Sequence, residues 1–99
     1  MNYQIRFRPE AEKDLEDAAK WYEEQRPGLG KELLDKVSSA LENLAKQPAM
    51  YPTVHRNIRR ALIQKFPFGL FYIMEENLII IIAFMHISRN PRLWKKRGL

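Results

Sequence analysis

Side chains that can bind phosphate or move protons gather in the second half of this 99-residue chain. His86 and Arg89 follow a long apolar segment, and Arg60 and Tyr72 lie in the two segments before it. Arginine can hold a phosphate and stabilise the charge that develops on it, while histidine or tyrosine moves protons to and from ribose oxygens. These four residues are therefore candidates for a catalytic site that cleaves RNA without a metal ion.

Each of these residues also has an ordinary structural interpretation. A histidine just after a buried strand usually makes a structural hydrogen bond, and a tyrosine on an alternating strand usually belongs to the core. Trp94 would pack the C-terminal segment onto the body of the protein. Clustered arginines with few acids nearby are not needed for folding, so Arg89 and Arg92 have the better claim to a binding role.

The positive charge is concentrated in the second half of the chain. Residues 1–50 contain eight Lys/Arg against ten Asp/Glu, whereas residues 51–99 contain nine Lys/Arg against two acids, which accounts for the net charge of +5. Such asymmetry indicates an anionic partner, either nucleic acid or an acidic protein segment. The residues predicted to bind a target or partner are Arg56, Arg59, Arg60, Arg89, Arg92 and Trp94. Lys95, Lys96 and Arg97 are interpreted as a solvated end.

Composition excludes several other classes of chemistry. The chain has no cysteine, no GxSxG, no glycine-rich phosphate loop and no HExxH, and its two histidines are far apart. We therefore expect no metal and no cofactor. The longest apolar run, residues 78–85, is too short to span a bilayer. We expect a cytoplasmic protein that does not contact a membrane.

Hydrophobic periodicity predicts the elements that position these residues. Residues 3–7 alternate as a half-buried strand, and residues 9–25 have helical spacing. The break RPGLG at 26–30 separates this helix from a second one, which ends before Pro48. Three further strands are predicted at 58–63, 68–74 and 78–87, and the last is apolar enough to be central in a sheet. RLWKKR at 92–97 adds one helical turn or an edge segment.

These elements predict an α+β fold with the order β-α-α-β-β-β. We expect one domain over residues 1–99, in which a small twisted antiparallel sheet carries the N-terminal helical hairpin on one face. The basic residues of the second half would then occupy the strand ends and the opposite face of the sheet. This arrangement would bring the candidate residues to one side of the molecule.

The run FPFGLFYIMEENLIIIIAFMHISRNPRLW resembles the C-terminal half of the RelE/ParE superfamily of bacterial toxins, in particular the ParE-like plasmid stabilisation proteins. The N-terminal half, with FRPEAEKDLEDAAKWYEE, is also similar to that family. The matching motif positions are Phe66, Pro67, Phe68, Leu70, Tyr72, His86, Arg89, Pro91 and Trp94. The resemblance implies the toxin of a type II toxin-antitoxin pair, neutralised by an antitoxin with a flexible, acidic segment.

The superfamily divides by mechanism, and the resemblance implies different targets for its two branches. RelE-like members cut mRNA on the ribosome with an arginine two places before the motif tyrosine, and this chain has Leu70 there. ParE-like members poison DNA gyrase by binding, which requires no catalytic group. We therefore favour a gyrase-binding toxin that is not an enzyme. The alternatives are a RelE-like mRNA endonuclease that uses the four catalytic candidates, and a non-toxic basic adaptor or degenerate toxin.

Overall fold

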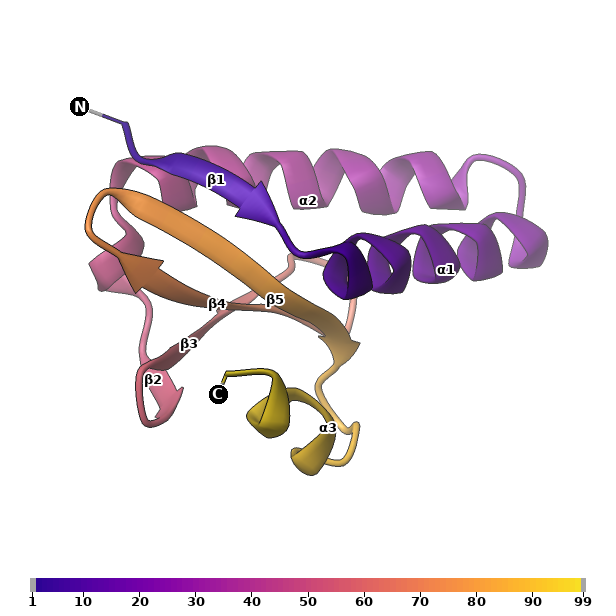
Figure 1. Ribbon diagram of the computed structural model, residues 1–99. Helices are drawn as coiled ribbons and strands as arrows, with labels where there is room; N and C mark the ends of the chain where they lie inside the picture. Colours follow the sequence, from indigo (N-terminus) through magenta and orange to yellow (C-terminus); the bar gives the residue numbers. More distant parts are fainter. Residues whose placement is uncertain (1, 99) are drawn as a thin grey trace.

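A helical hairpin covers one face of a five-stranded sheet in the computed structural model, which describes residues 2–98 (Figure 1). A short C-terminal helical segment lies against the other face. The predicted α+β fold with an N-terminal hairpin on one face is thereby confirmed. The elements are β1 (Gln4–Phe7), α1 (Pro9–Gln25), α2 (Leu29–Lys46), η1 (Pro48–Met50), β2 (Thr53–His55), β3 (Ile58–Leu62), β4 (Phe68–Glu75), β5 (Leu78–His86), α3 (Arg92–Lys95) and η2 (Lys96–Gly98).

The sheet is mixed, with the strand order β1-β5-β4-β3-β2. Strands β2 to β5 pair antiparallel, but β1 runs parallel to β5, with Gln4 opposite Leu78 and Phe7 opposite Ile81. The prediction of a wholly antiparallel sheet is therefore wrong for β1. A tight turn forces its two strands to be antiparallel, whereas β1 reaches β5 through the rest of the chain and is free to take either direction. The predicted central position of β5 is confirmed.

The segment between α2 and β3, predicted as a loop, contains a one-turn helix and the edge strand β2. Strand β2 has only three residues and no buried side chain, so it carries no hydrophobic alternation that a sequence pattern could reveal. It pairs with β3 around a tight turn at Arg56 and Asn57.

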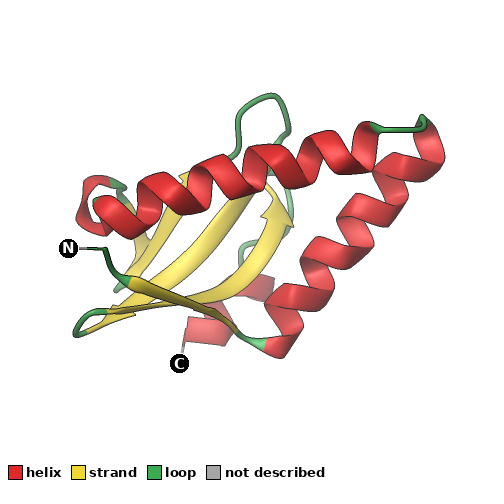
Figure 2. Cartoon of the chain, turned by 90° about the horizontal axis from the view of Figure 1, so that it is seen from above, coloured by secondary structure: helices red, strands yellow, loops and turns green. Residues whose placement is uncertain are grey.

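The hairpin of α1 and α2 is closed by local polar contacts and a close helix approach. The Glu23 carboxylate accepts hydrogen bonds from the backbone N–H groups of Gly28 and Gly30, at 2.9 and 3.0 Å, and so caps the first turn of α2. A Cβ atom at Gly30 would lie 2.6 Å from the Ala19 carbonyl oxygen, so only glycine allows the helices to approach this closely. Figure 2 shows the resulting V of two helices above the sheet.

The main core lies between this hairpin and the sheet. Ala11, Leu33 and Leu44 from the helices are completely buried against Leu70 and Ile79 from the strands. Burial of this apolar stripe is the main force that holds the helices to the sheet. Among the described residues, no helix is long and apolar enough to cross a membrane.

A second apolar cluster covers the opposite face of the sheet. The indole ring of Trp94 stacks on Phe71 at 4.5 Å between ring centroids and is only 6% exposed. The predicted packing of Trp94 onto the body is confirmed. The expectation that basic residues would occupy this face is corrected in part, because Arg60 lies on it but α3 and η2 pack against it with an apolar contact. The cluster contains Ile58, Phe71, Ile73, Ile82, Ala83, Met85 and Trp94.

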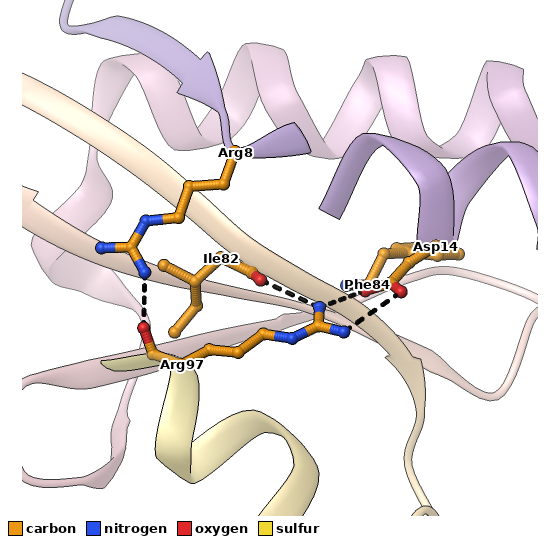
Figure 3. A network of polar contacts seen from close by, with 5 residues as sticks. All are labelled: Arg8, Asp14, Ile82, Phe84 and Arg97. Carbon is orange, nitrogen blue, oxygen red and sulfur yellow. Dashed lines mark hydrogen bonds and ion pairs between the residues drawn. The ribbon is translucent and has the colours of Figure 1, made fainter. Parts of the chain in front are cut away.

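Arg97 is bound to the body of the protein rather than solvated, which corrects its interpretation as part of a free end (Figure 3). Its Nη1 lies 2.6 Å from the Asp14 carboxylate and donates to the Ile82 carbonyl at 3.1 Å. Asp14 also accepts the Phe84 backbone N–H at 3.1 Å, and Arg8 donates to the Arg97 carbonyl at 2.5 Å. Because the β1–β5 register ends at Ile81, these groups satisfy the β5 backbone where β1 no longer covers it.

Candidate functional site

Tyr72 lies inside the core on the helical face of the sheet. Its side chain is completely buried, and its hydroxyl donates a hydrogen bond to the Pro48 carbonyl at 2.6 Å. Burial raises the pKa of Tyr72 above its ordinary value, because the phenolate would lose its hydration. Arg59, its cross-strand partner, donates to the carbonyls of Ala49 and Tyr51. Both side chains therefore anchor η1 to the sheet.

His86 and Arg89 lie at the far end of β5. The His86 ring packs edge-on against Phe68, with 5.5 Å between centroids, and its Nδ1 accepts the Ser88 backbone N–H at 3.1 Å. These contacts match the structural interpretation of this histidine. The Arg89 side chain is exposed in the turn that follows.

The structure separates three of the four catalytic candidates, Arg60, Tyr72 and His86. Arg60 pairs with Phe71 and lies on the face opposite to Tyr72, with its aliphatic stem over Gly69. Tyr72 pairs with Ile81, and His86 lies five residues further along β5, which corresponds to about 16 Å at the usual strand rise. Catalysis at one substrate bond would require these groups to lie much closer to one another, because each proton carrier must be within hydrogen-bond reach of the atom that it serves.

Replacing Tyr72 with phenylalanine tests its assignment to the core. The lost hydrogen bond to Pro48 is expected to lower the free energy of unfolding by about 1 kcal/mol. Because the pKa of Tyr72 is raised in the folded state, wild type should lose stability as the pH rises above about 10, and the variant should lose less. Urea denaturation between pH 7 and 11 measures both effects.

The same variant separates a structural role from a catalytic one. Tyr72→Phe should arrest growth as wild type does when it is expressed without an antitoxin, since the hydroxyl faces the core. Loss of arrest in a variant that remains folded at the growth temperature would assign the hydroxyl a role in activity. Tyr3→Phe provides the control for removal of a partly buried phenolic hydroxyl elsewhere.

One end of the sheet carries exposed apolar groups beside a cation. Leu62 ends β3 and is 58% exposed, and Ile87 follows β5 and is 49% exposed. Arg60 lies two residues before Leu62 on the same face of β3. We call Arg60, Leu62 and Ile87 the strand-end surface. Apolar residues in contact with water beside an arginine are typical of the centre of a protein-binding surface.

A basic pocket of about 370 Å³ lies between the β2–β3 turn and the C-terminal helical segment. Its lining includes two of the predicted binding residues, Arg56 and Arg92. The sequence prediction missed His55, Lys95 and Lys96, which complete the lining. No sequence signal beyond the local charge excess indicated them, because the two sides of the pocket are almost 40 residues apart along the chain.

The predicted binding residues thus divide among several places. Arg56 and Arg92 line the basic pocket, Arg60 belongs to the strand-end surface, and Arg59 is occupied by contacts with the η1 region. Trp94 is buried and supports the segment that carries the pocket. Among the described residues, no three carboxylate or imidazole groups gather closely enough to hold a metal ion.

Comparison with known proteins identifies the family. The family model of the ParE toxin of the type II toxin-antitoxin system parDE matches residues 5–91. No curated protein sequence matches the chain. In the chromosomal ParDE toxin-antitoxin system from P. aeruginosa, a chain that is 13% identical superposes with a TM-score of 0.76, covering 87% of this chain and 97% of that one.

Two further solved structures share the fold. A mutant of the E. coli toxin RelE in its free state has a TM-score of 0.74 at 15% identity, with full coverage of both chains. The toxin-antitoxin complex RelBE2 from Mycobacterium tuberculosis contains a chain with a TM-score of 0.60 at 17% identity, covering 87% of this chain and 99% of that one. With a family match over residues 5–91, this chain belongs to the ParE toxins of type II toxin-antitoxin systems, within the RelE/ParE superfamily.

Proposed function

We propose that this toxin arrests growth by binding and poisoning DNA gyrase, without catalysing a reaction of its own. The separation of Arg60, Tyr72 and His86 over two faces of the sheet supports this proposal most strongly. Poisoning by binding needs an exposed contact surface and no catalytic group. The strand-end surface supplies apolar contact area and a cation for such an interface.

The antitoxin belongs to the same proposal. The similar solved structures include the ParDE system and the RelBE2 complex, and a cognate antitoxin is the expected partner of this chain as well. A flexible acidic segment of that antitoxin would be attracted to the positive second half of the toxin. By covering the strand-end surface, the antitoxin would prevent contact with gyrase.

A gyrase supercoiling reaction tests the proposal directly. Purified toxin added to relaxed plasmid, gyrase and ATP is expected to inhibit supercoiling or to trap cleaved DNA, and addition of the cognate antitoxin should reverse the effect. The same sample is then added to ribosomes translating a defined mRNA, and primer extension detects breaks in that mRNA. Unaffected supercoiling at saturating toxin would contradict the proposal.

Two variants localise the contact. Leu62→Glu places a charge in the strand-end surface and is expected to weaken gyrase inhibition at least tenfold, since burying an unpaired charge at an interface is costly. Leu34→Glu changes a similarly exposed leucine, 43% exposed on α2, and is expected to inhibit as wild type does. Equal inhibition by both variants would exclude the strand-end surface as the gyrase contact.

Cleavage of mRNA by the same sample would instead support the RelE-like alternative. The overall superposition on the RelE toxin and the arginines of the second half favour this as the second candidate. If cleavage occurred, the double variant His86→Ala and Arg89→Ala should abolish it. Normal growth after induction, with neither activity, would support a degenerate toxin or an adaptor.

A further inference from the structure

Two segments that are distant in sequence form the walls of the basic pocket. His55 and Arg56 come from the end of β2 and its turn, while Arg92, Lys95 and Lys96 come from α3 and the start of η2. The rings of His55 and Trp94 meet edge to face, with 6.5 Å between centroids, and link the two walls. Figure 1 shows β2 and the C-terminal segment at the same side of the sheet.

The cations of the pocket have no acidic partners among residues 2–98. On the helical hairpin, by contrast, Lys13 pairs with Asp17 at 3.3 Å and Lys31 pairs with Asp35 at 3.0 Å. None of the ion pairs in the described part of the chain includes a residue that lines the pocket. The Lys95 ammonium lies 6.0 Å from the centroid of the Trp94 ring, a cation–π contact that helps to hold the C-terminal segment. The four cationic side chains around about 370 Å³ otherwise repel one another, which opposes folding.

The turn that carries Arg56 has a backbone conformation that disfavours arginine. Its φ angle is +53°, in the left-handed region that glycine and asparagine adopt most easily. A two-residue hairpin turn usually has one of those residues where φ is positive. Arg56 therefore places a cation at the rim of the pocket at a cost to the turn.

We propose that the basic pocket binds phosphate groups of a nucleic-acid backbone. Every side chain in its lining is cationic or an imidazole, so the pocket can neutralise consecutive phosphates and release their counterions. Trp94 lies buried beneath the lining and is not available to stack a base, so contacts here would position the backbone without reading its sequence.

This inference goes beyond gyrase binding and does not depend on it. A toxin that acts on gyrase meets a gyrase–DNA complex, and one that acts on the ribosome meets RNA, so either target presents phosphates beside the bound toxin. Binding is measured on the isolated toxin, and the result is therefore separate from the supercoiling assay. Duplex DNA and single-stranded RNA, tested in parallel, distinguish the two sources of phosphate.

Fluorescence anisotropy with a labelled 20-base-pair DNA duplex and a 20-nucleotide RNA tests the proposal. The double variant Arg92→Gln and Lys96→Gln, both exposed positions, should bind at least one of these probes at least tenfold more weakly. The slope of log K against log salt concentration should fall by about 2, one for each lost phosphate contact. Lys20→Gln with Lys46→Gln removes the same charge from the helical hairpin and should weaken binding less than twofold.

Arg56→Gly provides a second variant, in which binding should weaken without a loss of stability. Glycine accepts the positive φ angle, so this variant should unfold at an equal or higher temperature while binding nucleic acid more weakly. Loss of binding together with retained stability excludes simple unfolding as the cause.

Three results would overturn the proposal. Equal weakening by the pocket and hairpin variants would attribute binding to net charge alone. If a poly-glutamate peptide bound wild type as tightly as the nucleic acids, and the pocket variants lost that binding equally, the pocket would be a site for an acidic protein segment. Absence of any binding to DNA or RNA at low salt would likewise reject the proposed ligand.

Discussion

Replacement of Trp94 by alanine is expected to lower the free energy of unfolding by about 3–5 kcal/mol, the largest effect of any single substitution proposed for this protein. The indole is 6% exposed and stacks on Phe71, which is completely buried. Its removal leaves a cavity between the C-terminal segment and the sheet, and it also removes an aromatic pair. The total free energy of unfolding of a native protein is only about 5–15 kcal/mol, so this substitution would remove a large part of the stability.

Trp21 is the matched control, because it is the other tryptophan of the chain and is 55% exposed on α1. Trp21→Ala should change the free energy of unfolding by less than about 1 kcal/mol. Urea denaturation followed by circular dichroism compares the two variants without depending on tryptophan fluorescence. Similar small losses in both variants would mean that the C-terminal segment contributes little to folding.

The same substitution should affect the basic pocket. Trp94 supports the helical turn that supplies Arg92 and Lys95, and its ring also meets His55. Trp94→Phe retains an aromatic stack and should recover most of the stability and the nucleic-acid binding. Recovery by phenylalanine but not by alanine would show that the turn must be held in place for the pocket to form.

Replacement of Asp14 by alanine should have the second-largest effect, a loss of about 2–3 kcal/mol. Its carboxylate accepts hydrogen bonds from Arg97 and from the Phe84 N–H (Figure 3). Without the carboxylate, the Phe84 N–H would lose its side-chain partner, and the Arg97 guanidinium would keep only its hydrogen bond to the Ile82 carbonyl. The side chains of Asp14 and Arg97 are about 20% exposed, so water replaces the lost contacts only in part. The expected loss of stability is therefore smaller than that from breaking a fully buried ion pair.

Asp17 provides the control on the same helix. Its ion pair with Lys13 is 65–75% exposed, so Asp17→Ala should change the free energy of unfolding by at most about 0.5 kcal/mol. A double-mutant cycle of Asp14→Ala and Arg97→Ala then isolates the coupling between the two side chains. Equal effects of Asp14→Ala and Asp17→Ala would refute a stabilising role for this network.

The sequence by itself determined the type of most elements and the family. Helix α1 ends at Gln25 as the periodicity predicted, and the antiparallel pair β4–β5 has its polar turn. These predictions succeed because apolar residues recur with the period of the helix or strand, and their positions show which face of the element is buried. The motif in residues 66–94 likewise depends on local sequence alone.

The tertiary structure decided which distant residues meet. Arg97 binds Asp14 across 83 positions, β1 joins β5 in a parallel pair, and Arg60 is placed on the opposite face from Tyr72. Periodicity shows that a side chain is buried or exposed, but it does not name the partner, because packing is set by the whole chain. The basic pocket could be found only in the structure, because no sequence pattern links its two walls, which come from residues 55–56 and 92–96. The packing of Trp94 against the sheet brings them together.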